Sequence, residues 1–310
     1  MSVSDGPVET ESASDPLQGH FILSDVETLG RSTSESSLLL YCQTSRISPS
    51  RLSRDEALVK PLSTAPDSDQ TQPEFAANSH ARRLFDGIAF GYDFLSQSLS
   101  FFQTGVWRRF LVSRLTVGLG DRVLDICTGT GGVAMDIARK TGSVVVGVDL
   151  SEKMRSAAHR NFNKAGMAAN VSVVGGRAET LSFQDGCIDG ICFTYLLRYV
   201  DDPSRTLEEI VRVLKPGGAL VSLEFGIPEN TLLRGLWICH TRVFLPLSTR
   251  ILSPGWRYVG GFLGPSITEF YRKNSLDDLR RMWMDAGISN VQVKKLTWGA
   301  GIVMWGTKSP

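Results

Sequence analysis

The chain contains, at residues 123–152, the stretch VLDICTGTGGVAMDIARKTGSVVVGVDLSE. An apolar run that includes Asp125 leads into a glycine turn at 128–132, and apolar residues at helical spacing follow at 133–139. A second apolar run, 144–148, ends at Asp149. This order predicts a strand, a glycine loop, a helix and a second strand with an acid at its tip.

The loop and its two acids narrow the class of ligand. Gly129 and Asp149 are 20 residues apart, the spacing at which a carboxylate of a nucleotide-binding fold reaches ribose hydroxyls. The loop also fits G-x-G-x-x-A (Gly129, Gly131, Ala134), so a dinucleotide is an alternative. Asp125 disfavours it, because a carboxylate there would repel a pyrophosphate but suits a cationic tail. S-adenosylmethionine has such a tail, and a glycine turn that binds nothing is the third possibility.

Composition bounds the class of protein. The 310 residues suffice for one large domain or two small ones, and 42% hydrophobic with 21% charged residues is typical of globular proteins. The five cysteines form no C-x-x-C pair and no metal spacing, which favours free thiols in a reducing cytoplasm and no metal site. No apolar run reaches the ~18–20 residues of a membrane span.

The two ends of the chain differ in character. Residues 1–80 carry 12 acids, 5 bases and 22 serines and threonines without periodicity, which predicts a disordered extension. One domain is expected at 81–310. Its first part, 81–119, has apolar residues at helical spacing interrupted by Gly87 and Gly91, which predicts two or three short helices that could cover a ligand.

The rest of the domain alternates predicted helices and strands. Ser151, Pro203 and Ser275 begin helices. Five further strands are predicted at 171–174, 188–193, 219–225, 291–293 and 302–306, with the last two antiparallel. The pattern predicts a Rossmann-like α/β fold with a seven-stranded, mostly parallel sheet, an antiparallel end strand and helices on both faces.

Residues 228–266 do not fit this alternation. They contain an apolar stripe at helical spacing that includes Trp237 and Phe244, with arginines beside it, and Pro246 is expected to break the helix. An insertion before the last helix is either a lid over the ligand or an ordinary packed helix.

Seven segments resemble, in order, the ubiquinone/menaquinone biosynthesis C-methyltransferase family, whose fold is that of class I S-adenosylmethionine-dependent methyltransferases. They are FDGIAFGYDFLSQSLSFFQTGVWRRF, VLDICTGTGG, VDLSEKM, AETLSFQDGCID, YLLRYVDD, RVLKPGG and LEFGIP. The resemblance covers about residues 82–308. Departures cluster in the expected substrate half, where Leu196-Leu197-Arg198-Tyr199 replaces the family's Gly-Leu-Arg-Asn element.

The resemblance implies that S-adenosylmethionine is the cofactor. It places the family's cofactor contacts on Thr130, Asp149, Arg177, Ala178 and Thr194. The loop and the end of the second strand add further predicted cofactor-binding residues: Asp125, Thr128, Gly129, Gly131 and Leu150.

The resemblance also implies C-methylation of a prenylated quinol of the demethylmenaquinol or ubiquinol type. Arg198 could stabilise a phenolate-like oxygen, because arginine is a poor base; its alternative role is a surface ion pair with 201–202. Tyr92, Asp93 and His240 are the other candidates for proton handling, although Tyr92 and His240 also fit structural roles.

A quinol with an isoprenoid tail implies a lipophilic acceptor and peripheral contact with a membrane surface, for which the aromatic and basic side chains of 228–266 offer support. On this interpretation the protein can form a homodimer and has no nucleic-acid partner. Two other functions remain open. One is methylation of another small molecule at O, N or C on the same fold, and the other is non-catalytic or nicotinamide-dinucleotide binding.

Overall fold

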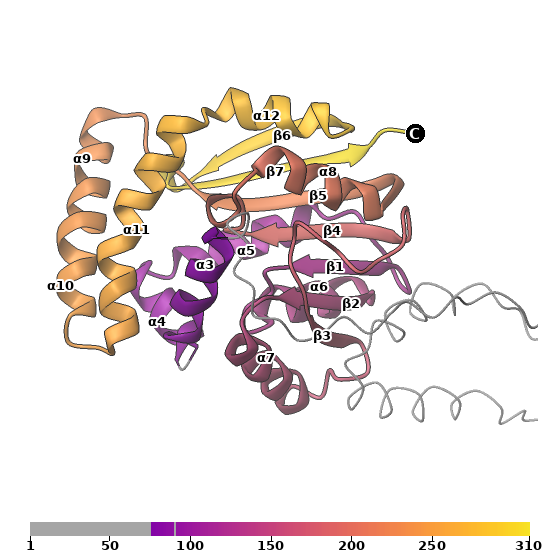
Figure 1. Cartoon of the computed structure of the whole chain (residues 1–310), viewed down its shortest axis with the longest axis horizontal. Coiled ribbons are helices and arrows are strands. Elements are labelled where there is room, and N and C mark those ends of the chain that lie inside the picture. Colours follow the sequence, from indigo (N-terminus) through magenta and orange to yellow (C-terminus); the bar gives the residue numbers. More distant parts are fainter. Residues whose placement is uncertain (1–75, 90) are drawn as a thin grey trace, which may run out of the picture.

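The computed structural model describes residues 76–89 and 91–310, and its centre is a seven-stranded sheet with the order β3-β2-β1-β4-β5-β7-β6 (Figure 1). The strands are β1 (Arg122–Ile126), β2 (Val144–Asp149), β3 (Val171–Gly175), β4 (Ile188–Thr194), β5 (Leu214–Phe225), β6 (Ile288–Leu296) and β7 (Gly301–Lys308). Strands β1 to β5 pair in parallel, whereas β7 pairs antiparallel with both β5 and β6. The predicted fold class is confirmed.

Helices cover both faces of this sheet. They are α5 (Gln103–Arg114), α6 (Gly132–Thr141), α7 (Glu152–Lys164), α8 (Pro203–Val213) and α12 (Leu276–Asp285). On β1, Leu124 and Ile126 join one buried apolar cluster with α8 and α12, and Val123 joins another with α5, α6 and α7. The alternation along the strand therefore buries both faces, as expected for a parallel sheet.

Two further groups of helices lie beyond the carboxyl ends of β1 and β4 (Figure 1). The first consists of α3 (Ala76–Asp86) and α4 (Tyr92–Leu99), so three short helices, counting α5, precede β1 as predicted. The second, in the inserted segment, consists of α9 (Thr231–Cys239), α10 (Leu245–Thr249) and α11 (Pro254–Lys273). Helix α3 begins ahead of the predicted domain start at residue 81, and the predicted extension lies outside the described residues up to residue 75.

Two local predictions are wrong. The chain stays helical through Pro246, because a π-helical turn, His240–Phe244, precedes it and puts the proline in the first turn of α10, where its missing N–H is not needed. Strand β5 begins at Leu214 rather than Ala219. Gly217 and Gly218, which lie between these two residues, are accommodated by an irregular register of β5 against β4. Among the described helices, none combines the length and apolarity needed to cross a bilayer.

Candidate functional site

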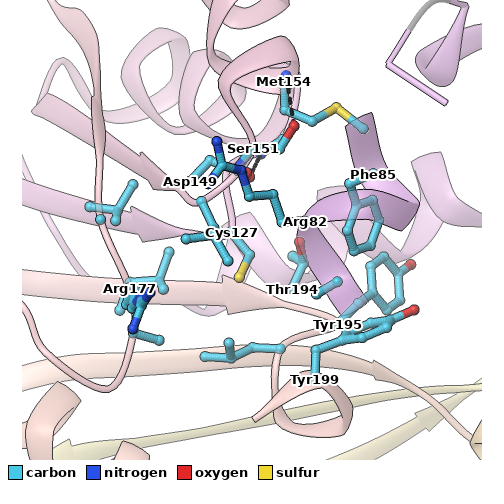
Figure 2. Close-up of a pocket in the computed structure, with 18 of the residues that line it drawn as sticks. Arg82, Phe85, Cys127, Asp149, Ser151, Met154, Arg177, Thr194, Tyr195 and Tyr199 are labelled. Atoms are coloured by element: carbon cyan, nitrogen blue, oxygen red, sulfur yellow. Dashed lines mark hydrogen bonds between the residues drawn. The ribbon is translucent and has the colours of Figure 1, made fainter. Parts of the chain in front are cut away.

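A cavity opens at the carboxyl ends of β1, β2 and β4, and its wall is completed by α3 and by the loop after β3 (Figure 2). Six of the ten predicted cofactor residues line it: Gly129, Asp149, Leu150, Arg177, Ala178 and Thr194. Figure 2 shows Phe85, Tyr195 and Tyr199 together on one side, with Arg177 on the other. This is the edge of the sheet at which α/β folds bind nucleotides, and we call the space the cofactor cavity.

Asp149 is fixed at the tip of β2 by backbone donors. Its Oδ2 accepts a hydrogen bond from the Gly129 N–H and its Oδ1 from the Ser151 N–H, both at 2.8 Å. Burial raises the pKa of Asp149, and these two N–H groups counteract the shift. Each carboxylate oxygen keeps a second lone pair, so the side chain can still accept hydrogen bonds from a ribose diol.

The glycine loop is shaped by two residues with positive φ. Gly131, with φ +83°, begins α6, and a Cβ there would lie 2.2 Å from the ring of Phe162. Gly129, with φ +58°, has no atom within 4 Å of the position of a Cβ. Only glycine fits the first site sterically, whereas the second leaves space open in the cavity for a ligand to approach the backbone.

The other four predicted cofactor residues do not line the cavity: Thr128, Thr130 and Gly131 belong to the loop itself, and Asp125 lies in β1. Asp125 is fully buried, and its oxygens accept hydrogen bonds from the Thr128 hydroxyl at 2.7 Å and the Cys192 thiol at 3.2 Å. The Thr130 hydroxyl donates to Asp93 Oδ1 at 2.6 Å, which ties α4 to the loop. These hydrogen bonds of Asp125 and Thr130 therefore stabilise the conformation of the loop.

The buried carboxyl of Asp125 predicts a pH dependence of stability. Burial raises its pKa from 3.8 to about 6, against the opposing effect of its two hydrogen bonds. The folded state therefore binds the proton more tightly than the unfolded chain, and stability falls as pH rises from about 4 to about 6. The loss is about 3 kcal/mol for a shift of this size. We expect urea unfolding of the cofactor-free protein to show it, and Asp125→Asn to lose this part of the pH dependence. An identical pH dependence in both proteins would contradict the assignment.

Two non-glycine residues adopt left-handed backbone at the ends of neighbouring strands. Cys127 follows β1 with φ 58°, and Tyr195 follows β4 with φ 57°. Such conformations cost about 1–3 kcal/mol each and persist where the surrounding packing requires them. The turn at Tyr195 stacks its ring on Phe225, with 4.2 Å between centroids, where it lines both the cofactor cavity and a second cavity.

The second cavity has a volume of about 430 Å³ and is mainly apolar. We call it the apolar cavity. Its walls come from α4, α5, the inserted helices and the turn before β7, and its large apolar side chains include Ile88, Leu99, Phe101, Trp107, Leu233, Leu236, Trp237, Leu245, Trp256, Val259, Leu263 and Ile267. It shares Phe85, Tyr92, Tyr195 and Tyr199 with the cofactor cavity, so the two spaces meet at an aromatic wall.

Arg198 lies on the wall of the apolar cavity and is buried. Its side chain is 2% exposed, its Nε lies 3.6 Å from Glu224 Oε2, and its Nη1 donates to Ser266 Oγ at 3.0 Å. Burial alone would lower the pKa of Arg198, but Tyr199 and Glu224 raise it, so the guanidinium stays charged. The alternative ion pair with 201–202 is therefore wrong, and the partner is a buried acid on β5.

The three other predicted catalytic residues occupy different places. Tyr92 lines both cavities, and burial raises its pKa to about 12. His240 lines the apolar cavity beside Phe244, and burial lowers its pKa, so it is neutral at pH 7. Asp93 lines neither cavity and is engaged by the hydroxyl of Thr130.

Several residues of the site were not predicted individually, although they lie in segments that match the family. Tyr195, Tyr199 and Phe85 form the aromatic wall, and Glu224 pairs with Arg198, although its segment LEFGIP was among the matching motifs. Arg108 lines the apolar cavity, and its Nη1 lies 2.8 Å from where a Cβ on Gly132 would be. The sequence shows that a basic residue, Arg108, follows Trp107. It does not show that this side chain lies over the start of α6.

Comparison with known proteins places this chain in a family. Residues 74–308 match the model of the ubiE/COQ5 methyltransferase family. The ubiquinone/menaquinone biosynthesis C-methyltransferase UbiE of Geotalea uraniireducens is 34% identical over 73% of this chain and 95% of its own length. The demethylmenaquinone methyltransferase of Geobacillus kaustophilus is 32% identical over 73% and 95%.

Solved structures agree on the fold. A chain from a complex of the Haloferax volcanii Trm112 methyltransferase activator with a methyltransferase superposes with a TM-score of 0.51 and 19% identity, covering 73% of this chain and 98% of its own. The chain thus belongs to the ubiE/COQ5 methyltransferase family and is an S-adenosylmethionine-dependent methyltransferase.

Proposed function

We propose that the protein methylates a ring carbon of a prenylated quinol of the demethylmenaquinol or ubiquinol type. The observation that carries the proposal is the apolar cavity of about 430 Å³, which meets the cofactor cavity at a shared aromatic wall. A flat quinol ring fits between such rings, and an isoprenoid chain needs apolar surface of this extent. Relatives whose names specify quinone methylation support the same class of acceptor.

The residues present fit the donor. Gly129 leaves open space at the loop, and Asp149 faces the cavity with free lone pairs for the ribose. Arg177, Ala178 and Thr194 complete the wall. We propose that these residues hold the adenosine part of S-adenosylmethionine, and that Asp125 and its hydrogen-bonded neighbours hold the loop and face the cationic tail from beneath.

Arg108 is a candidate partner for the carboxylate of the donor. Its guanidinium lies over the first turn of α6, whose N-cap residue, Gly131, provides no side-chain hydrogen bond. A cation at a helix N-terminus is unfavourable by itself, and among the described residues Arg108 has no ion pair within 4 Å. An anion between the guanidinium and the helix N–H groups removes this repulsion.

Arg108→Gln is therefore expected to weaken binding of S-adenosylhomocysteine about tenfold or more, since a charge-assisted hydrogen bond is lost. Binding of 5′-methylthioadenosine, which lacks the amino-acid part, should stay the same. Calorimetric titration of both ligands measures the difference. The neighbouring exposed arginine, in Arg109→Gln, is the matched control, and equal losses for both ligands would contradict the assignment.

Three side chains of the apolar cavity fit the chemistry. The donor, when bound, supplies an electrophilic methyl group. We assign Arg198 to stabilise the phenolate-like oxygen that makes the ring carbon nucleophilic, because its charge is permanent and buried. His240 is neutral and can accept the hydroxyl proton, and the proton of the methylated ring carbon then returns to the quinol oxygen as the ring regains aromaticity. Tyr92 keeps its own proton and can only orient the ring.

The test uses the full chain with isotopically labelled donor and a demethylated menaquinol presented in lipid extract. Label in the methylated quinone fraction supports the proposal. If another metabolite takes the label while the quinones stay unlabelled, the acceptor assignment is wrong and methylation at O, N or C of a different molecule replaces it. Titration with a nicotinamide dinucleotide in parallel tests the remaining alternative.

The proposal has consequences for the rest of the chain. A prenylated acceptor resides in a bilayer, so the enzyme needs peripheral contact with a membrane. The inserted helices form the outer wall of the apolar cavity, which supports a role as a lid. The disordered extension before the domain stays a prediction, and so does a homodimer. Neither has a role in the proposed reaction.

A further inference from the structure

The inserted helices carry apolar side chains that the fold does not bury. Figure 1 shows α9 and α10 at the edge of the molecule away from the sheet. Five side chains on this run are 41% to 86% exposed and follow one another at intervals of one or two turns: Leu232, Leu236, Phe244, Leu247 and Ile251. We call them the lid stripe. Single exposed apolar residues need no explanation, but a contiguous stripe indicates an interaction surface.

Two tight turns extend this surface around the mouth of the apolar cavity. The turn between α4 and α5 presents Phe101 and Phe102, and the turn between β6 and β7 presents Trp298, at 60%, 66% and 74% exposure. All three have positive φ, so both turns hold aromatic side chains outward at a cost in backbone strain. The ring of Phe101 lies 5.5 Å from that of Phe244, which joins the first turn to the lid stripe.

The same residues mark where the cavity opens. Phe101, Leu236 and Trp298 line the apolar cavity and are nevertheless at least 60% exposed. The cavity therefore reaches the surface within the apolar patch. A ligand that enters there passes between aromatic side chains without first crossing a polar surface.

The charge of the inserted segment is one-sided. Residues 228–266 contain four arginines, no lysine and a single acid, Glu229, which is paired with Lys295, although the whole chain has a net charge of only +1. All four arginines are exposed, and Arg234, Arg242 and Arg250 recur at every eighth residue along the run that carries the lid stripe. Apolar and aromatic side chains bordered by arginines are the composition of helices that lie in the interface of an anionic membrane.

We propose that the lid stripe, with the two aromatic turns, docks on an anionic lipid bilayer, so that the apolar cavity opens into the membrane. A second copy of the chain is a poorer occupant, because two such surfaces would bring their arginines together, and the one acid of the segment, Glu229, is already paired with Lys295. The inference rests on the proposed function only for the identity of the molecule that enters. The docking itself depends on the surface alone.

The test is flotation of the full chain with phosphatidylcholine vesicles, with and without phosphatidylglycerol. We expect binding that requires phosphatidylglycerol and weakens with salt. The apolar variant L232Q/L247Q/I251Q and the charge variant R242Q/R250Q change exposed residues outside both cavities, and each should reduce partitioning about tenfold or more. Both should bind S-adenosylhomocysteine as the unaltered chain does.

Matched controls lie elsewhere on the molecule. L119Q/M284Q removes exposed apolar residues, and R160Q/R280Q removes exposed arginines, both outside the proposed surface. These variants should float normally. Absence of binding to either vesicle, or equal losses in variants and controls, overturns the proposal, as does a dimer that only the apolar variant dissociates.

The outcome separates the docking surface from the proposed reaction. Methylation of a short-tailed, water-soluble quinol by a chain that fails to bind vesicles would refute the surface and leave the reaction intact. Vesicle binding without methylation of any quinol would do the reverse.

Discussion

Replacing Arg198 by alanine is expected to reduce turnover by about a hundredfold or more and to destabilise the fold at the same time. Loss of an electrostatic stabiliser in a site closed to water costs about 10²–10³ in kcat. The side chains of Arg198 and Glu224 are 2% and 5% exposed, so the single change also leaves a buried carboxylate without its partner. Breaking such a pair costs about 3–5 kcal/mol.

A second variant separates these two effects. Arg198→Met with Glu224→Gln removes both charges, and the glutamine oxygen can still accept the hydrogen bond that the Leu197 N–H donates to Glu224. Urea unfolding should show that stability returns to within about 2 kcal/mol of the unaltered chain, since apolar replacement of a buried pair is often neutral. Turnover should stay low while S-adenosylhomocysteine binding is preserved. Recovery of activity in this double variant would show that Arg198 is only structural.

The second large effect is expected for Asp149→Ala. Cofactor affinity should fall by about 1–3 kcal/mol, which corresponds to about 5- to 150-fold in Kd, because the ribose loses its acceptor at the tip of β2. Calorimetric titration with S-adenosylhomocysteine measures the loss. Glu208→Ala, which removes an exposed carboxylate from α8 outside both cavities, is the control.

Asp149 also anchors the loop through the Gly129 N–H, so a weaker Kd could come from loosening of the loop. A ligand with 2′-deoxyribose resolves this. It should bind the unaltered chain less tightly than S-adenosylhomocysteine does, whereas Asp149→Asn should distinguish the two ligands poorly. Equal discrimination in both proteins would show that the carboxylate does not contact the ribose.

The nucleotide-binding half was predictable because its signals are local. Strand, glycine loop, helix and Asp149 lie within 30 consecutive residues, and each follows from backbone preference or periodicity. The same local reasoning could not show which way each polar side chain turns. Asp125 lies inside a strand that is buried on both faces, so its side chain supports the loop from below. The thiol of Cys192, on the neighbouring strand, donates a hydrogen bond that holds the carboxylate there and away from the cavity.

The substrate half was less predictable because its contacts join distant segments. Glu224 follows Arg198 by 26 residues and meets it only because β4 and β5 are neighbours in the sheet. The apolar cavity needs residues from before β1, from the inserted helices and from the turn before β7. The predicted helix break at Pro246 was wrong for a local reason, because a π-helical turn is rare and has no clear sequence pattern.

The aromatic side chains that the two cavities share have a consequence for the order of binding. When one molecule binds, the shared side chains adopt positions that also form the wall of the other cavity. These side chains are Phe85, Tyr92, Tyr195 and Tyr199. Occupancy of either space is therefore expected to change affinity in the other, and any such factor is the same in both directions. Under the proposed function, saturation with the spent donor should therefore change the affinity for the quinol, and this thermodynamic linkage would tie product release to the arrival of the next lipid.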